Sequence, residues 1–133
     1  MNGHDETGGF LWPISDILRR RNGHLDTGIL GPYFLLKQLT ALGRNDLIYT
    51  MANQTTFPGW GHMMKNDATT IWEEWGGGNS GIHSSFLSIG AWFIQGLGGI
   101  QPDEAQPGFA HFQIRPGIVG DPAYAPAVLA RKT

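Results

Sequence analysis

The chain has 133 residues, the length of one ordinary domain, and its 41% hydrophobic and 15% charged content is typical of a protein with a buried core. Its net charge of −2 argues against nucleic acid or an anionic membrane as the main partner, because both call for a basic face. The chain has no cysteine, which excludes disulfides and thiolate metal sites, and no spacing of His, Asp and Glu predicts a metal or cofactor site.

Helical signals dominate the first half of the chain. Residues 15–21 predict a short helix, with Ser15 as its N-cap and arginines near the C-terminal end, where the helix dipole favours cations. Pro32 suits the first turn of a second helix, and Asn45 can cap a third. Two helices joined by so short a turn must pack antiparallel, so residues 32–53 predict an αα-hairpin.

The second half of the chain changes character along its length. Residues 55–65 are typical of a loop, and a short helix through Glu73 is expected to follow. A longer helix with one apolar stripe is expected over residues 83–97. Beyond it, five prolines exclude helices of any length, and residues 110–114 alternate like one half-buried strand. A domain boundary is therefore predicted close to residue 100.

The stretch from Ala68 to Trp75 holds the strongest chemical signal. It places two adjacent carboxylates, Glu73 and Glu74, between the indoles of Trp72 and Trp75. An indole stacks on the C–H face of a pyranose, and a carboxylate handles protons or water beside the anomeric carbon. Alternatively, the two indoles fill a core and both glutamates are solvated. The residues alone decide neither between these two readings nor between Glu73 and Glu74.

A few residues outside this stretch are further candidates. Trp60 lies on a loop, where it can either stack on a sugar or anchor the loop in the core. His83 opens the predicted long helix, and a neutral imidazole can both donate and accept a hydrogen bond. His24 and Asp26 are predicted to be structural, fixing the entry to a hairpin through loop hydrogen bonds.

Ordered motifs across residues 20–120 carry a resemblance to a known family. In chain order they are His24-Leu-Asp-Thr-Gly-Ile-Leu-Gly31, Phe57-Pro-Gly-Trp-Gly61, Ala68-Thr-Thr-Ile-Trp-Glu73, His83, Trp92-Phe93, Gly98-Gly99-Ile100 and Pro107-Gly108-Phe109. Together they resemble the bacterial α-L-rhamnosidases of glycoside hydrolase family 78. The resemblance implies a mainly α fold, an (α/α)6 barrel of six helical hairpins followed by a small β-sandwich. It implies that residues 1–100 are a C-terminal portion of the barrel and that residues 101–133 begin a truncated sandwich.

The resemblance also implies an inverting reaction that uses two acidic residues about 6.5–9.5 Å apart. Glu73, directly after Ala-Thr-Thr-Ile-Trp, corresponds to the general base, and His83 to a histidine that contacts rhamnose hydroxyls. We expect Trp60, Trp72 and Trp75 to bind the sugar. The family's general acid belongs to a motif upstream of the matched stretch, so the isolated chain is expected to be inactive. The implied substrate is a terminal α-L-rhamnoside of a glycoside or polysaccharide.

Two alternatives stay open at this point. The chain could instead be a non-catalytic carbohydrate-binding or structural helical module, or a six-hairpin glycosidase for another sugar. Part of a barrel would expose apolar helix faces, so self-association is expected. No apolar run approaches the roughly 20 residues of a membrane span. The first residues are polar and acidic, unlike a signal peptide, which favours a cytoplasmic chain unless its true beginning is missing.

Overall fold

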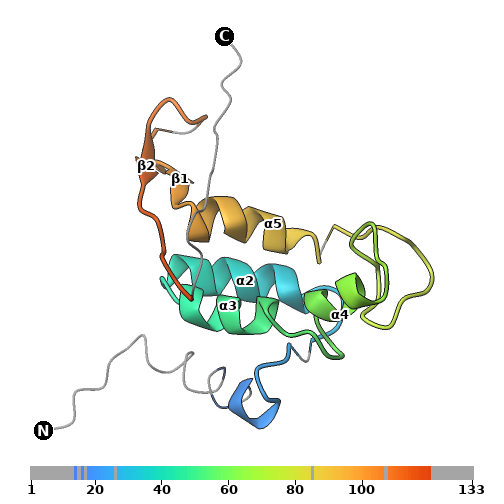
Figure 1. Cartoon of the computed structure of the whole chain (residues 1–133). Coiled ribbons are helices and arrows are strands. Elements are labelled where there is room, and N and C mark those ends of the chain that lie inside the picture. The colour runs from blue at the N-terminus through green and yellow to red at the C-terminus, as the bar shows by residue number, and fades with distance from the viewer. Residues whose placement is uncertain are drawn as a thin grey trace, which may run out of the picture.

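An antiparallel pair of helices forms the centre of the fold. The computed structural model describes residues 14, 16, 18–25, 27–84, 86–106 and 108–120. Helix α2 spans Gly31–Ala41 and helix α3 spans Asn45–Ala52, so the αα-hairpin predicted over residues 32–53 is confirmed. Pro32 lies in the first turn of α2, where its missing N–H removes no intrahelical bond. Figure 1 shows α2 between α3 and α5.

A short helical segment precedes this hairpin. Residues 14, 16 and 18–20 are helical, in agreement with the helix predicted over residues 15–21. Ser15, its predicted N-cap, lies outside the described residues. Leu18 is buried against the hairpin and so ties this segment to the core.

The stretch predicted as loop contains a further helix. Helix α4 spans Trp60–Lys65, directly after a cis Phe57–Pro58 bond and the extended Gly59. Trp60 and Met63 are one helical turn apart and both are buried, so a two-residue apolar face holds this helix on the core. An apolar face this short is below what periodicity in the sequence can resolve.

The short helix predicted through Glu73 is wrong. Residues 68–75 form bends and turns that lead from α4 into a long loop. Three consecutive β-branched residues, Thr69 to Ile71, lose side-chain freedom in a helix, which disfavours one here. The glutamates therefore lie on a loop, and the helical spacing of their side chains does not apply.

The predicted long helix over residues 83–97 begins later than expected. Helix α5 spans Ser88–Trp92 and continues as the π-helical turn η1, Phe93–Leu97. The Gly98 N–H donates to the Phe93 carbonyl oxygen at 2.9 Å, which closes the wide turn. Gly96 has no space for a β-carbon, because the Trp92 and Asn45 side chains lie against it. The π-helical turn therefore brings the chain against the core at a position that only glycine fits.

A two-stranded antiparallel ribbon follows the helices. Strand β1 spans Ile100–Pro102 and strand β2 spans Phe112–Ile114, with Ile100 opposite Ile114. The strand predicted over residues 110–114 is thus confirmed in its last three residues, whereas its partner β1 was not predicted. Three residues that end in proline carry no alternation, which is why the sequence hides β1. No helix in the described part of the chain is long and apolar enough to cross a membrane.

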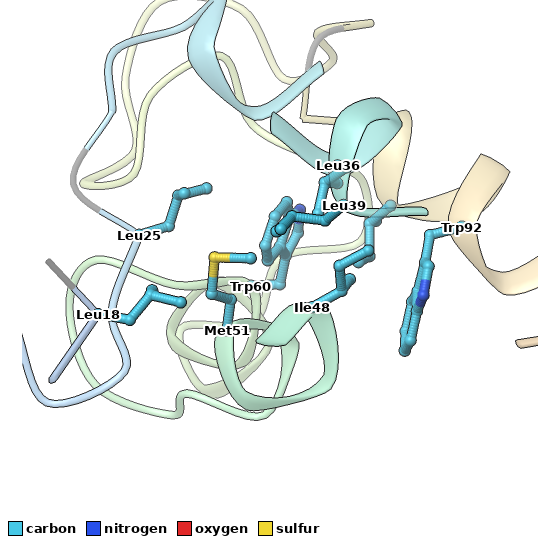
Figure 2. Close-up of a cluster of buried hydrophobic side chains, with 9 residues drawn as sticks. Leu18, Leu25, Leu36, Leu39, Ile48, Met51, Trp60 and Trp92 are labelled. Carbon is cyan, nitrogen blue, oxygen red and sulfur yellow. The ribbon is translucent and has the colours of Figure 1, made fainter. Parts of the chain in front are cut away.

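The core joins every helix of the structure. Figure 2 shows Leu36 and Leu39 of α2 facing Ile48 and Met51 of α3, and Trp60 and Trp92 belong to the same cluster. One polar side chain, Asn45, is buried with them, and its Oδ1 accepts a hydrogen bond from Trp92 Nε1 at 2.9 Å. Asn45 was predicted to cap α3, but it makes no such cap; the cap position is Arg44. Asn45 instead pairs the indole N–H that α5 brings into the core.

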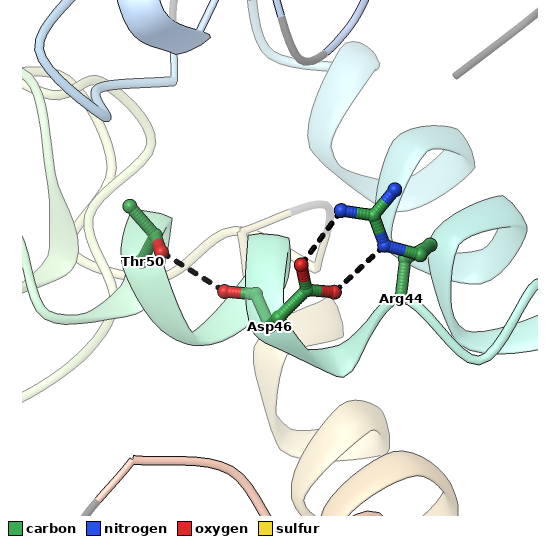
Figure 3. A network of polar contacts seen from close by, with 3 residues as sticks. All are labelled: Arg44, Asp46 and Thr50. Atoms are coloured by element: carbon green, nitrogen blue, oxygen red, sulfur yellow. Dashed lines mark hydrogen bonds and ion pairs between the residues drawn. The ribbon is translucent and has the colours of Figure 1, made fainter. Parts of the chain in front are cut away.

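The start of α3 carries an exposed ion pair. Arg44 Nε and Nη2 donate to the two carboxylate oxygens of Asp46 at 2.8 and 2.6 Å (Figure 3). Thr50 Oγ1, one turn later, donates to the Asp46 carbonyl oxygen at 2.9 Å. The hydrogen bonds from Arg44 hold the pKa of the Asp46 carboxyl below its ordinary value, and a carboxylate in the first turn also suits the helix dipole.

Candidate functional site

The predicted site lies on the long loop between α4 and α5, at the far end of the molecule from the β1–β2 ribbon (Figure 1). Two arms of this loop run side by side. The His83 N–H donates to the Ile71 carbonyl oxygen and the Glu73 N–H donates to the Ser80 carbonyl oxygen, both at 3.1 Å. Thr70 Oγ1 also donates to the Gly81 carbonyl oxygen. The loop is therefore a closed structure with its own hydrogen bonds.

Glu73 and Glu74 have different partners on this loop. Glu73 is half-buried, and its Oε2 accepts the Ser80 backbone N–H at 3.0 Å. Glu74 is exposed, and its Oε1 accepts Asn79 Nδ2 at 2.7 Å. Each carboxylate thus accepts a hydrogen bond from a different residue of the opposite arm.

An aromatic cluster lies beside the loop. Trp75 is half-buried between Trp60 and Phe86, with ring centroids 5.1 Å and 4.1 Å away, and its Nε1 donates to the Thr27 carbonyl oxygen at 3.3 Å. Trp60 is only 6% exposed, and its Nε1 donates to the Phe86 carbonyl oxygen at 3.0 Å. Of the two roles open to Trp60, this position corresponds to the buried loop anchor.

The other two predicted residues flank this cluster. The half-buried His83 ring lies 6.5 Å from the Phe86 ring, centroid to centroid. Trp72, also half-buried, lies over the backbone of Gly77, where an added β-carbon would be 3.3 Å from its ring. The structure therefore gathers Trp60, Trp75 and His83 around Phe86, and joins Glu73 and Trp72 to them through the same loop. Phe86 lies in the apolar stripe of the helix predicted over residues 83–97, and nothing in the sequence marks it as part of a site.

An open groove lies beside this loop. It has a volume of about 710 Å³ and lies between α3, α4, α5, η1 and residues 68–71 of the loop. Its walls are mostly apolar, and the only predicted site residue among them is Trp60. A sugar site needs polar groups that converge on the hydroxyls, so this groove does not correspond to the predicted site.

His24 and Asp16 have structural partners. His24 is hydrogen-bonded through Nδ1 to the Arg21 carbonyl oxygen at 2.9 Å and through Nε2 to Thr56 Oγ1 at 2.7 Å, in agreement with its predicted structural role. Asp26 lies outside the described residues. Asp16 accepts hydrogen bonds from Arg19 and Arg20, which lower the pKa of its carboxyl. A carboxyl held ionised in this way does not suit a general acid.

Within the described ranges, no three His, Asp or Glu side chains lie where they could hold a metal ion together. The predicted site brings a carboxylate, Glu73, and an imidazole, His83, onto one loop beside indole rings. This combination of groups is the one that carbohydrate sites use.

Comparison with known proteins places the chain in a family. The model of the bacterial α-L-rhamnosidase six-hairpin glycosidase domain matches residues 5–97. An α-L-rhamnosidase of Streptomyces avermitilis is 35% identical over 125 residues, which cover 86% of this chain and 12% of that protein. One of Alteromonas sp. is 33% identical over 123 residues, 84% of this chain and 13% of that protein.

Solved structures agree with this comparison. The Streptomyces avermitilis α-L-rhamnosidase complexed with L-rhamnose matches with a TM-score of 0.66 at 32% identity, over 77% of this chain and 11% of that one. The α-L-rhamnosidase from Dictyoglumus thermophilum matches with a TM-score of 0.62 at 33% identity, over 76% of this chain and 12% of that one. The fold is thus part of a six-hairpin glycosidase domain, mostly helical with a small antiparallel ribbon. The chain belongs to the family of bacterial α-L-rhamnosidases, and it spans about one eighth of the length of the relatives it matches.

Proposed function

We propose that this chain supplies the general base and part of the sugar-binding surface of an inverting α-L-rhamnosidase, with Glu73 as the base. Membership of the family supports the activity at a coarse level, as does the neighbouring structure that is described as complexed with L-rhamnose. The general acid is expected from a part of the domain that the matched relatives have and this chain does not span.

The observation that carries the proposal is the way Glu73 is held. Its Oε2 accepts the Ser80 N–H, whereas no donor to its Oε1 is recorded among the described residues. A general base needs one oxygen that fixes its orientation and another that can take a proton from water. In an inverting glycosidase that water attacks the face of the sugar ring opposite the leaving group. Glu74 instead has an amide partner and is exposed, which suits a supporting role.

The aromatic residues have different proposed roles in sugar binding. Trp72 and Trp75 are half-buried, so part of each residue remains exposed for contact with a sugar. Trp60 packs edge-on against Trp75 and so supports it from within the core. His83, half-buried on the same loop as Glu73, supplies ring nitrogens for sugar hydroxyls.

The experiment grafts this chain into the matching segment of the Streptomyces avermitilis enzyme, which restores a complete domain. In the graft, Glu73→Gln keeps the shape of the side chain but removes the base. General-base assistance is worth typically 10²–10⁴-fold, so kcat on an aryl α-L-rhamnoside is expected to fall by about that factor. Glu74→Gln, assayed beside it, is the matched control and is expected to lower kcat far less.

Two results would contradict the proposal. If Glu74→Gln abolishes turnover while Glu73→Gln leaves it intact, the base is assigned to the wrong residue. If the graft with both glutamates intact binds L-rhamnose but shows no turnover, the chain is a carbohydrate-binding module and not part of a hydrolytic site.

A further inference from the structure

The turn that joins Glu74 to Ser80 has an unusual backbone. Three consecutive residues lie at positive φ: Gly77 at 78°, Gly78 at 120° and Asn79 at 49°. Asparagine accepts the left-handed region more readily than most residues with a β-carbon, but at a cost. A compensating contact is therefore expected at Asn79.

That contact is the hydrogen bond from Asn79 Nδ2 to Glu74 Oε1, 2.7 Å long. A hydrogen bond to an ionised carboxylate is stronger than one between neutral groups. The Gly77 N–H also donates to the Glu74 carbonyl oxygen at 3.2 Å, and the Trp72 ring lies against Gly77. The turn is thus held by hydrogen bonds from Gly77 and Asn79 to Glu74 and by the contact of Gly77 with the Trp72 ring.

The closed turn determines where the Ser80 amide lies. The peptide plane that carries the Ser80 N–H begins at Asn79, so the backbone of Asn79 aims this donor. The donor meets Glu73 Oε2 at 3.0 Å, and the Glu73 N–H returns a bond to the Ser80 carbonyl oxygen at 3.1 Å. If the turn opened, Glu73 would lose the donor that fixes its carboxylate.

We propose that Asn79 is a positioning residue: by binding Glu74 Oε1 it keeps the turn closed and thereby holds the Ser80 amide on Glu73 Oε2. The two carboxylates thus accept from different donors, Glu74 from the Asn79 side chain and Glu73 from the Ser80 amide. The claim that this arrangement serves catalysis rests on the proposed function, whereas the arrangement itself does not.

The first experiment follows the Ser80 amide of the full chain by nuclear magnetic resonance over a pH range that titrates carboxylates. An amide that donates to a carboxylate changes its proton shift when the carboxylate ionises. We expect the Ser80 amide to titrate in the parent chain and to stop titrating in Glu73→Gln. An amide that titrates unchanged in Glu73→Gln would overturn the proposal.

Variants of Asn79 test its part in the arrangement. Asn79→Gly accepts the same backbone but loses the amide, and it should at least halve the titration amplitude of the Ser80 amide. Asn79→Asp sets two carboxylates against each other and should do the same. The double variant Glu74→Gln/Asn79→Asp exchanges donor and acceptor, so it should restore the amplitude. An unchanged amplitude in both single variants, or no restoration in the double variant, would overturn the proposal.

A matched control is available in another turn. Asn22 also lies at positive φ, 52°, and is exposed. Asn22→Asp therefore makes the same chemical change at a similar backbone angle, and it should leave the Ser80 titration unaltered. An equal loss in this control would mean that the effect is general to the chain, and it too would overturn the proposal.

Kinetics of the grafted enzyme separate this proposal from the proposed function. Misplacing a catalytic group costs rate even when binding survives, so Asn79→Asp should lower kcat about tenfold with KM nearly constant, and the double variant should recover it. Unchanged kcat in Asn79→Asp would overturn the positioning role. If Glu73→Gln keeps full turnover while the Ser80 titration behaves as expected, the proposed function fails and the arrangement around Asn79 stands.

Discussion

At the scale of single residues, Arg44 and Asp46 show how one contact sets a pH dependence. The pKa of Asp46 is lowered in the folded chain, chiefly by its hydrogen bonds from Arg44. A depressed carboxyl pKa stabilises the fold above the unfolded value of about 4, and this stabilisation is lost as the pH falls through the folded pKa. The Asp46 side chain is 56% exposed, so solvent screening keeps the contribution small.

We therefore expect Asp46→Asn to lower the free energy of unfolding by about 0.5–1 kcal/mol at pH 7, through the lost ion pair and the lost charge at the start of α3. The parent and the variant should converge as the pH falls through the folded pKa of Asp46, which lies below the unfolded value of about 4. Urea unfolding at pH 7 and at low pH measures this. Asp67→Asn, an exposed aspartate for which no ion pair is recorded in the described structure, is the control. A difference that persists undiminished at low pH would contradict the ionic explanation.

The residues of the site illustrate what the sequence can specify. The motif located Glu73 and its indoles, but only the family resemblance could prefer Glu73 to Glu74. The loop supplies a physical difference between them, because Ser80 and Asn79 come from the opposite arm. These hydrogen-bond partners depend on how the turn closes, and no repeating pattern in the sequence predicts that. Asn45 is a similar case: a predicted helix cap is instead the partner of the Trp92 indole across the core.

At the scale of elements, the sequence predicted the helices with a regular apolar pattern but missed the short helix α4 and the short strand β1. In the α2–α3 hairpin, helix α2 has a full apolar period with Pro32 in its first turn and Gly43 just after its end, and the hairpin appeared as predicted. Helix α4 and strand β1 have six and three residues. Elements this short are decided by tertiary contacts, such as the burial of Trp60 or the pairing of Ile100 with Ile114. The division at residue 100 into two domains stays a prediction.

The β1–β2 ribbon depends on one glycine. Gly99 lies at a φ of 69°, and a β-carbon there would collide with the backbone of Arg115 and Pro116. Arg115 donates its N–H to the Gly99 carbonyl oxygen at 2.9 Å, so the collision lies where the ribbon meets the helices. Gly108 has a similar φ of 83°, but open space surrounds it. An alanine at Gly99 would therefore suffer both backbone strain and a steric clash, whereas an alanine at Gly108 would suffer backbone strain alone.

We expect Gly99→Ala to open the ribbon and to speed hydrogen exchange at the Arg115 amide at least tenfold, a loss of about 1.4 kcal/mol in local protection. Gly108→Ala should cost only the strain of a left-handed alanine, about 1–2 kcal/mol, and should leave the Arg115 amide protected. Hydrogen exchange followed by nuclear magnetic resonance gives both values. Equal protection of Arg115 in the two variants would show that the close approach at Gly99 does not hold the ribbon.

At the scale of the whole molecule, the described surface is unusually apolar around the groove between α3, α4 and α5. Met64, Ile82, Leu87 and Phe93 line this groove and are 75%, 62%, 49% and 51% exposed. Large apolar side chains gathered around one cavity are typical of a surface that another protein segment covers. The chain spans about one eighth of the length of the relatives it matches. In those relatives, other parts of the protein are available to cover a surface of this kind.

We expect the isolated chain to self-associate through this surface. Burying the exposed half of a phenylalanine side chain is worth about 1.4 kcal/mol, or a factor of about ten in a dissociation constant. Phe93→Ser and Met64→Gln should therefore each weaken association roughly tenfold in sedimentation equilibrium. Ile118→Ser removes a side chain that is 83% exposed but does not line the groove, so it should change little. A monodisperse parent chain with a sharp, reversible unfolding transition would contradict this expectation, because the chain would then be a stable monomer with this apolar surface exposed to water.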